Sequence, residues 1–590
     1  MEQSNELTRR QLLHRLGALG GGTVLYQAAA GLGMTTSLEA QTPNVQRGIG
    51  RNRHVVILGA GVAGLATAWE LLRRDSGFRV TIVEANPKEG GRSLTLRPGD
   101  VFTERLPAGQ TYRDAPGQGT ATQRCEFEPR TATGFDRPYL NAGPGRIPSA
   151  HTHVLDYCRA LNVPLEIYVM NSESNLGRGP GAPTFVYRHA ANDAQGWIAE
   201  RLFAFVPQMA DLSPAEKTAL EELLITFGAL GNGAVGERGR FVKDGKYQRS
   251  TRSGYKRLPG VRPGESVDPV PLADLLASGY WKPPFYQPQD FLWQPTLFQP
   301  VGGMDRIVDA LVKAIQGYKD RATIVRNAPV SRVRYDTASR KWQVFRSGSA
   351  TPVVADQCVS NIPIPLLAPL LESGIPFAPP FISSLREVAG TRDFLATTTK
   401  VGWQARRALW QKASEDRVVP IFGGISWTGH PMTQLWYPSD RFYDELGVLT
   451  GAYNFAPNAT TWGEYTPKWR LDRAREGARE LAGNDFADGL GRGLAIAWQN
   501  MPFQRGGWAQ WEKVQNRLVH YNTLLDGDRT VGFYIVGDQL SQLPGWQEGA
   551  VAAALNAVSL LAVPNFAPAA VSAVPDSRVV VEGLIPLQVE

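Results

Sequence analysis

Cysteine and histidine are scarce in this chain. Its 590 residues include three cysteines, Cys125, Cys158 and Cys358, and seven histidines. The cysteines show no Cys-x-x-Cys spacing, and their odd number provides no disulfide framework. Of the histidines, only His151 and His153 are close together, without a matching cluster of acids or thiolates. We therefore expect neither a disulfide scaffold nor a metal site.

Long basic runs and long apolar runs are also lacking. The net charge of +7 is modest for this length, and the basic residues do not cluster with aromatic ones, so we expect no nucleic-acid partner. No segment is long and apolar enough for stable insertion into a membrane. The 43% of hydrophobic residues is ample for large cores, and the length indicates two or more structural units.

The first 45 residues differ in composition from the rest. Thr8-Arg9-Arg10-Gln11-Leu12-Leu13 places two arginines before an uncharged, Gly- and Ala-rich stretch from Leu16 to Leu38. This pattern resembles a twin-arginine export signal, whose apolar region is only weakly hydrophobic. We expect residues 1–45 to be an export leader of a periplasmic or secreted protein. The alternative is a cytoplasmic protein with an uncleaved leader.

A glycine-rich turn joins an apolar run to a helical pattern at His54-Val-Val-Ile-Leu-Gly-Ala-Gly-Val-Ala-Gly64. The run is typical of a buried parallel strand. Gly59 permits the tight turn, Gly61 lets the backbone approach a pyrophosphate, and Gly64 lets the helix pack closely on the strand. The pyrophosphate would lie at the helix N-terminus, where free N–H groups favour anions.

A second expected strand, residues 80–83, ends at Glu84, which stands 20 residues after Gly64. A carboxylate at this distance holds the ribose diol of a bound dinucleotide. Strand, glycines, helix, strand and acid in this order predict a dinucleotide site. A glycine-rich structural turn is the alternative.

Several further motifs resemble the flavin amine oxidase family, most closely the bacterial FAD-dependent L-amino acid oxidases. They are Gly90-Gly91-Arg92 after the acid, Pro300-Val-Gly-Gly-Met304, and Gly532-Phe-Tyr-Ile-Val-Gly537-Asp538 followed by the helix opening at Pro544-Gly-Trp546. Asn86 stands where the family usually has an arginine. The resemblance spans about residues 53 to 562.

The resemblance implies a fold that combines α/β and α+β parts. We expect a Rossmann-like FAD-binding domain with a parallel sheet, interleaved with a substrate domain of mixed sheet and a helical insert. The expected segments are 50–100, 298–365 and 496–563 for the FAD domain, 101–297 and 366–495 for the substrate domain, about 198–232 for the insert, and 564–590 for a C-terminal tail. Residues 97–140 are expected to be a long loop, and Val579–Val581 a short strand.

The resemblance also implies the residues that contact the cofactor. Asp538 would meet the ribityl chain, Arg92 a phosphate, and the helix after Trp546 the flavin ring. The implied cofactor-binding residues are Gly59, Gly61, Gly64, Glu84, Gly91, Arg92, Gly145, Arg146, Val333, Asp538 and Trp546. No cysteine lies near Gly506-Gly-Trp508, where covalently flavinylated relatives carry theirs, so we expect FAD to be bound non-covalently.

Four residues carry the implied substrate chemistry. Arg146, in Asn141-Ala-Gly-Pro-Gly-Arg146-Ile-Pro148, resembles the arginine that clamps the substrate carboxylate, and a guanidinium suits that role because it binds a carboxylate through two parallel hydrogen bonds. Lys400, in a Thr-rich strand, resembles the lysine that holds a water near the flavin. Tyr453 would donate to the carboxylate, and Trp546 would form an aromatic cage with it.

These residues predict oxidative deamination of L-amino acids by dioxygen, giving 2-oxo acids, ammonia and hydrogen peroxide, in a homodimer. The alternatives are an amine or polyamine oxidase and a decarboxylating amino-acid monooxygenase; a flavoprotein without turnover is a further one. The sequence does not determine which substrate side chain is preferred. The aromatic residues in 280–300 and 400–440 favour an apolar one, whereas Asp440 and Asp444 would suit a basic one.

Overall fold

The computed structural model describes residues 43–129, 137–233, 237–241, 251–283, 285–294, 296–412 and 419–581. The expected export leader lies almost wholly outside these residues. Among the helices that are described, none combines the length and the apolarity needed to cross a membrane.

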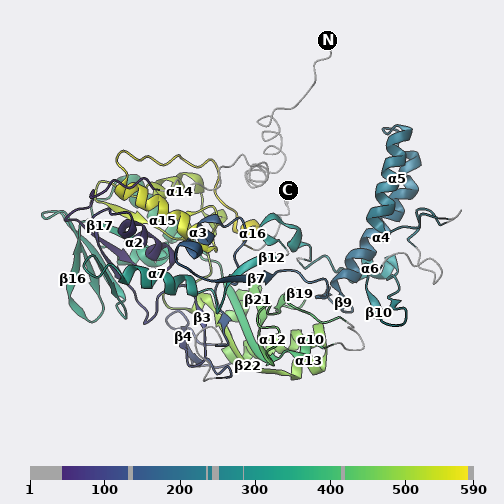
Figure 1. The fold of residues 1–590 in the computed structure, drawn as a ribbon. Coiled ribbons are helices and arrows are strands. Elements are labelled where there is room, and N and C mark those ends of the chain that lie inside the picture. The colour runs from purple at the N-terminus through teal and green to yellow at the C-terminus, as the bar shows by residue number, and fades with distance from the viewer. Residues whose placement is uncertain are drawn as a thin grey trace, which may run out of the picture.

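A five-stranded parallel sheet forms the centre of one half of the molecule (Figure 1). Its strands in spatial order are β13 (Ala322–Val325), β2 (Arg79–Val83), β1 (His54–Leu58), β17 (Gln357–Ser360) and β23 (Phe533–Ile535). Strands far apart in the sequence are therefore neighbours, as in the pairing of Val55 in β1 with Gln357 in β17. The predicted fold class, a Rossmann-like domain beside a domain of mixed sheet, is confirmed.

Alternate residues of β1 face two different cores. Val55 and Ile57 pack under helices on one face, whereas Val56 and Leu58 pack on the other face. The first face is covered by α2 (Val62–Arg73), α3 (Thr152–Ala160), α7 (Arg306–Gln316) and α15 (Gln547–Ala562). The second is covered by β14 (Val330–Asp336), β15 (Lys341–Arg346), β16 (Ser349–Ala355), α8 (Ile364–Leu367), α9 (Pro379–Gly390) and α14 (Arg517–Asp526). This burial on both faces explains why β1 is a continuous apolar run.

A seven-stranded mixed sheet builds the other half. Its strands in spatial order are β22 (Leu490–Ala497), β18 (Thr398–Arg406), β21 (Leu446–Phe455), β20 (Gln434–Trp436), β19 (Ile425–Thr428), β8 (Leu176–Arg178) and β9 (Phe185–Val186). Strand β18 lies between β22 and β21, and it is buried from Thr398 to Ala405. The register places Lys400 directly opposite Tyr453.

Two long helices form an arm that projects from the mixed sheet (Figure 1). They are α4 (Tyr187–Phe205) and α5 (Pro214–Gly228). Ser213 and Glu216 form the reciprocal capping box at the start of α5, with Pro214 at its first position. The helical pattern expected at 198–232 is present, but it starts earlier, at Tyr187, and is interrupted between the two helices.

Two local expectations were wrong. The segment 97–140, expected to be a loop, contains a hairpin of β4 (Val101–Arg105) and β5 (Thr120–Arg124). The expected strand at 579–581 is instead part of a short helix, α16 (Ser577–Val580), because Asp576 caps its N-terminus by accepting a hydrogen bond from the Arg578 backbone.

Further strands and helices join these elements. They are β3 (Thr95–Leu96), β6 (Leu140–Asn141), β7 (Leu165–Val169), β10 (Tyr255–Arg257), β11 (Glu265–Ser266), α6 (Leu272–Ser278), η4 (Phe291–Trp293), β12 (Thr296–Pro300), α10 (Ala408–Gln411), α11 (Asn458–Gly463), α12 (Pro467–Ala482) and α13 (Asn484–Asp488).

Candidate active site

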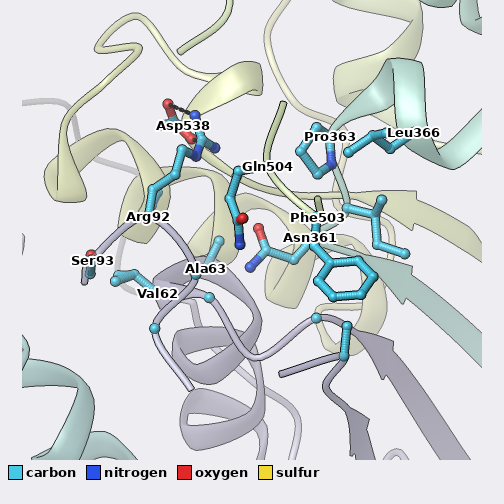
Figure 2. Close-up of a pocket in the computed structure, with 18 of the residues that line it drawn as sticks. Val62, Ala63, Arg92, Ser93, Asn361, Pro363, Leu366, Phe503, Gln504 and Asp538 are labelled. Carbon is cyan, nitrogen blue, oxygen red and sulfur yellow. Dashed lines mark hydrogen bonds and ion pairs between the residues drawn. The ribbon is translucent and has the colours of Figure 1, made fainter. Parts of the chain in front are cut away.

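An elongated cavity of about 290 Å³ lies at the carboxyl ends of the parallel strands (Figure 2). This edge is where open α/β sheets bind their ligands. The sequence-predicted residues that line it are Gly59, Gly61, Glu84, Gly91, Arg92, Asp538 and Trp546. The structure thus brings together residues from both ends of the chain.

The glycine loop has the geometry that its sequence predicts. Gly59 has a φ of 94°, which favours glycine. A Cβ atom on Gly64 would lie 2.2 Å from the Gly59 carbonyl oxygen, so only glycine fits there. Asn361 directly follows β17, and its side-chain amide faces the loop. With the amide oxygen turned toward the loop, Asn361 would accept hydrogen bonds from Gly61 N at 3.2 Å and Gly64 N at 3.3 Å. Asn361 was not predicted, although its place directly after a buried strand is a usable signal.

Glu84 lines the cavity directly after β2. Its carboxylate accepts hydrogen bonds from Ala60 N and Asn86 N, both at 2.8 Å. Burial raises the pKa of Glu84, and these hydrogen bonds oppose the shift. The Asn86 side chain also donates to Glu84, at 2.9 Å. Asn86, which stands where the family usually has an arginine, therefore orients the Glu84 carboxylate.

Arg92 and Asp538 form an ion pair in the lining of the cavity (Figure 2). Arg92 Nη2 lies 2.5 Å from Asp538 Oδ1, and Arg92 Nη1 donates to the Gly507 carbonyl oxygen at 2.6 Å. Gly545 N donates to Asp538 at 2.8 Å. The guanidinium expected to meet a phosphate is thus held by Asp538, and the pair fixes the loop that precedes α15.

Four predicted cofactor residues lie outside the lining of this cavity. One of them is Gly64 of the glycine loop. Val333 is fully buried in β14, and Val330 of the same strand lines the cavity instead. Gly145 lines a second, smaller cavity, and Arg146 lies in a cluster of aromatic rings. Pro144, which directly precedes Gly145 in the sequence, lines the main cavity.

The Arg146 guanidinium lies between two tryptophan rings. Its Cζ atom is 4.3 Å from the ring centroids of both Trp293 and Trp436. Only 7% of Arg146 is exposed, and burial lowers its pKa. The groups that act on it electrostatically are the phenols of Tyr168 and Tyr453, and no described carboxylate pairs with it. Its Nε atom is buried without a hydrogen-bond partner.

Lys400 is a second buried cation beside Arg146. Its Nζ atom donates to the carbonyl oxygens of Asn141, at 3.0 Å, and Gly143, at 2.5 Å. Burial, aided by the charge of Arg146, lowers the pKa of Lys400 to about 7. The lysine lines the second cavity, of about 60 Å³, together with Gly145, Tyr168 and Trp436.

The aromatic cage expected of Trp546 and Tyr453 also includes Trp293 and Trp436. Trp546 lies against Trp293, with centroids 5.2 Å apart. Tyr453 lies against Trp436, with centroids 5.3 Å apart. Both belong to one aromatic cluster. Trp293 and Trp436 were noted only as members of tryptophan-rich segments, because nothing in their local sequence marks them as neighbours of Arg146.

A cluster of His151, His153 and Glu548 does not form a metal site. Glu548 accepts hydrogen bonds from the backbone of His153 and Val154 and from the His153 ring, so it caps α3. In the described parts of the chain, no group of three potential ligands could hold a metal ion.

Comparisons with known proteins place these observations in a family context. The model of the flavin containing amine oxidoreductases matches residues 132–562, and that of the FAD dependent oxidoreductases matches residues 54–95. YobN of Bacillus subtilis, named as a candidate L-amino-acid oxidase, is 22% identical over 85% of this chain and 92% of its own length. L-amino acid oxidase Cdc18 of Crotalus durissus cumanensis is 22% identical over 86% of this chain and 89% of its own length.

Solved structures show the same fold. Cyclohexylamine oxidase from Brevibacterium oxydans superposes with a TM-score of 0.51 at 15% identity, over 86% of this chain and 98% of that one. A putrescine oxidase variant with redesigned cofactor binding gives a TM-score of 0.50 at 16% identity, over 86% and 97% of the two chains.

Proposed function

This chain belongs to the flavin-containing amine oxidoreductases, and from that premise we propose that it is an L-amino acid oxidase. The proposed reaction converts an L-amino acid, dioxygen and water to a 2-oxo acid, ammonia and hydrogen peroxide. A flavin cofactor, and an amino or amine substrate oxidised by oxygen, follow from the family itself. The restriction of the substrate to amino acids is our further proposal.

The surroundings of Arg146 support the restriction of the substrate to amino acids. Arg146 is a buried cation that no described carboxylate neutralises, and it lies beside a second buried amine, Lys400. Burying an unpaired charge is costly, so such a site favours an anionic ligand. An α-carboxylate would pair with the guanidinium through two hydrogen bonds. A substrate that carries only an ammonium group would instead meet like charge, which argues against an amine or polyamine oxidase.

The residues that line the main cavity suit FAD. The glycine loop and Glu84 at one end suit the ADP half, and the start of α15 near Trp546 suits the ring at the other. Gln547, the first residue of that helix, has a buried Oε1 atom without a partner. A flavin held by these residues would supply an acceptor for the hydride of the substrate Cα and a route for two electrons to dioxygen.

The lining also supports non-covalent binding of FAD. The described residues that line the main cavity include no cysteine, histidine or tyrosine, the side chains that could attach a flavin. Cys125, Cys158 and Cys358 are buried elsewhere.

We assign the following roles to the chain's own residues. Arg146 and Tyr453 bind and orient the carboxylate, which fixes the position of the Cα–H bond. Trp293 and Trp436 hold the guanidinium and exclude water. Lys400 Nζ carries a proton below about pH 7; its positive charge would stabilise negative charge that develops on dioxygen. The substrate reacts as the neutral amine, so no strong side-chain base is required.

The surroundings support an apolar or aromatic substrate side chain. The walls near Arg146 are tryptophan, tyrosine and phenylalanine rings. The two acids that would suit a basic side chain are occupied. Asp440 pairs with Arg407 and Arg441, both at 3.3 Å, and Asp444 pairs with Arg441 at 3.5 Å.

Peroxide release measured against the twenty L-amino acids and a series of amines tests the proposal. We expect release with apolar and aromatic amino acids and none with the amines. Release with amines alone would overturn it. Product analysis gives a second criterion, because a decarboxylating monooxygenase would form an amide instead of a 2-oxo acid.

Two further proposals concern assembly and location. Exposed apolar side chains on the arm, such as Ile198 and Leu223, each 61% exposed, support a homodimer. Replacing both with Glu should then yield a monomer in light scattering. The leader supports export through the twin-arginine route, so replacing Arg9 and Arg10 with Lys should retain the protein in the cytoplasm.

A further inference from the structure

Tyr168 is a buried phenol whose hydroxyl lacks a partner. It lies in β7, opposite Leu297 of β12, and only 6% of it is exposed. Its oxygen is buried and makes no hydrogen bond. Buried polar groups are normally paired, so an unpaired hydroxyl at a cavity indicates a missing ligand. Tyr168 lines the small cavity beside Lys400.

The ring of Tyr168 is fixed near the proposed carboxylate site. It packs edge-on against Trp436, with centroids 6.4 Å apart. Tyr453 packs edge-on against the same indole, 5.3 Å away. Trp436 also stacks on Arg146. One indole therefore positions a guanidinium and two phenols that come from different strands.

Arg146 and Tyr168 act on each other electrostatically without forming a hydrogen bond. The guanidinium charge lowers the pKa of Tyr168, although burial outweighs it and raises that pKa to about 12. The phenol therefore keeps its proton at neutral pH and can serve as a donor. Both residues present a buried polar atom without a partner, Nε of Arg146 and the Tyr168 hydroxyl.

We propose that the Tyr168 hydroxyl is a third donor to the substrate carboxylate, beside Arg146 and Tyr453. This inference rests on the proposed function. A carboxylate has about four lone-pair sites. The guanidinium occupies two of them and Tyr453 one, which leaves one site for Tyr168. Tyr168 positions the substrate and takes no part in the transfer of hydride or protons.

Tyr168→Phe tests this assignment because it removes only the hydroxyl. In the protein without ligand that oxygen has no partner, so the melting temperature should stay unchanged or rise. We expect the KM for amino acids to rise about tenfold or more, with kcat nearly unchanged, because a hydrogen bond to a charged group is lost. Calorimetric titration of the holoenzyme with benzoate, a carboxylate without an amine, should show the same loss of affinity.

Tyr139→Phe is the matched control. Tyr139 lines the same small cavity, but the largest electrostatic effects on it come from Asp440, Glu166, Arg441 and Arg97. We expect its affinity for benzoate to equal that of the unaltered protein.

The outcomes separate this inference from the proposed function. In one outcome the unaltered protein binds benzoate and oxidises amino acids, and Tyr168→Phe binds benzoate equally well. The assignment of Tyr168 as a third donor is then wrong, and the proposed function stands. If Tyr139→Phe weakens binding as much as Tyr168→Phe, the effect belongs to the cavity in general, and the assignment is again wrong. If the unaltered protein neither binds benzoate nor oxidises amino acids, both proposals fail.

Discussion

Arg146 stacks on Trp436, with its Cζ atom 4.3 Å from the centroid of the indole ring. The same indole lies 5.3 Å from Lys400 Nζ and packs against the ring of Tyr453. It therefore forms a shared wall for the two buried cations and the phenol that the proposed reaction requires. The guanidinium is held by apolar contacts, which leaves its hydrogen-bonding edge for a ligand.

Replacing Arg146 with Ala should abolish efficient use of amino acids. Truncating a buried, hydrogen-bonded charge pair costs roughly 2–5 kcal/mol, which corresponds to about 30- to 4,000-fold in affinity. We expect this loss in the KM for amino acids. Arg146→Lys should restore only part of it, because an ammonium cannot bind a carboxylate in a bidentate manner. Steady-state kinetics of both variants measure this, and an unchanged KM in Arg146→Ala would contradict the clamp.

Replacing Lys400 with Met should slow the reaction with oxygen more than the reduction by substrate. Since Lys400 has a pKa of about 7, the protonated fraction falls as the pH rises through 7. If the cation assists the reaction of the reduced enzyme with oxygen, the rate of reoxidation should decline over this pH range. Lys400→Met should be reoxidised slowly, and its rate should not change with pH over the same range. Stopped-flow mixing of reduced enzyme with oxygen at several pH values measures it. An equal pH profile in both proteins would exclude Lys400.

The same lysine should impose a pH dependence on stability. Its pKa is lowered in the folded protein, so between about pH 7 and its unfolded value the unfolded chain binds more protons. The contribution of Lys400 to the free energy of unfolding therefore rises with pH across this window. Urea unfolding at pH 7 and pH 9 should show Lys400→Met gaining stability relative to the unaltered protein at the lower pH. A difference that is independent of pH would contradict the shift.

Glu104→Gln should destabilise the fold strongly. Glu104 and Arg470 form an ion pair in which both side chains are fully buried, and Glu104 also accepts a hydrogen bond from Ala497 N at 2.9 Å. Breaking such a pair leaves a buried charge and costs about 3–5 kcal/mol. The exposed pair of Lys468 and Asp472 gives the control, because Asp472→Asn should change stability by less than about 0.5 kcal/mol. Urea unfolding distinguishes the two variants.

Denaturation should release the flavin. If FAD is held without a covalent bond, acid precipitation of the purified protein will leave the yellow cofactor in the supernatant. Flavin that sediments with the protein would contradict the proposal.

Local sequence rules predicted the glycine loop and the acid that follow the first two strands of the parallel sheet. Gly59, Gly64 and Glu84 are defined by backbone geometry and by their spacing within one strand–helix–strand unit, so a single sequence is sufficient to place them. The Arg92–Asp538 pair joins residues 446 positions apart. Each was predicted to contact the cofactor, but their contact with each other depends on the sheet topology.

The aromatic box around Arg146 could not be predicted in this way. Trp293 comes from a short 3₁₀ helix and Trp436 from the end of a strand, and no periodicity connects either with residue 146. Tyr168 reads as an ordinary strand residue, and only its burial without a partner makes it notable. The hairpin at 101–124 was missed for a related reason, because its polar strands are stabilised by the distant partner of Glu104, Arg470.

The central claim is that the site selects a carboxylate next to the reacting amine. The most direct test is anaerobic mixing of the oxidised holoenzyme with L-phenylalanine or with phenylethylamine, which differ only in that carboxylate, while the visible absorbance of the flavin is followed. The account predicts rapid bleaching by L-phenylalanine and bleaching slower by at least two orders of magnitude with phenylethylamine at equal concentration. Equal or faster bleaching by phenylethylamine would contradict it.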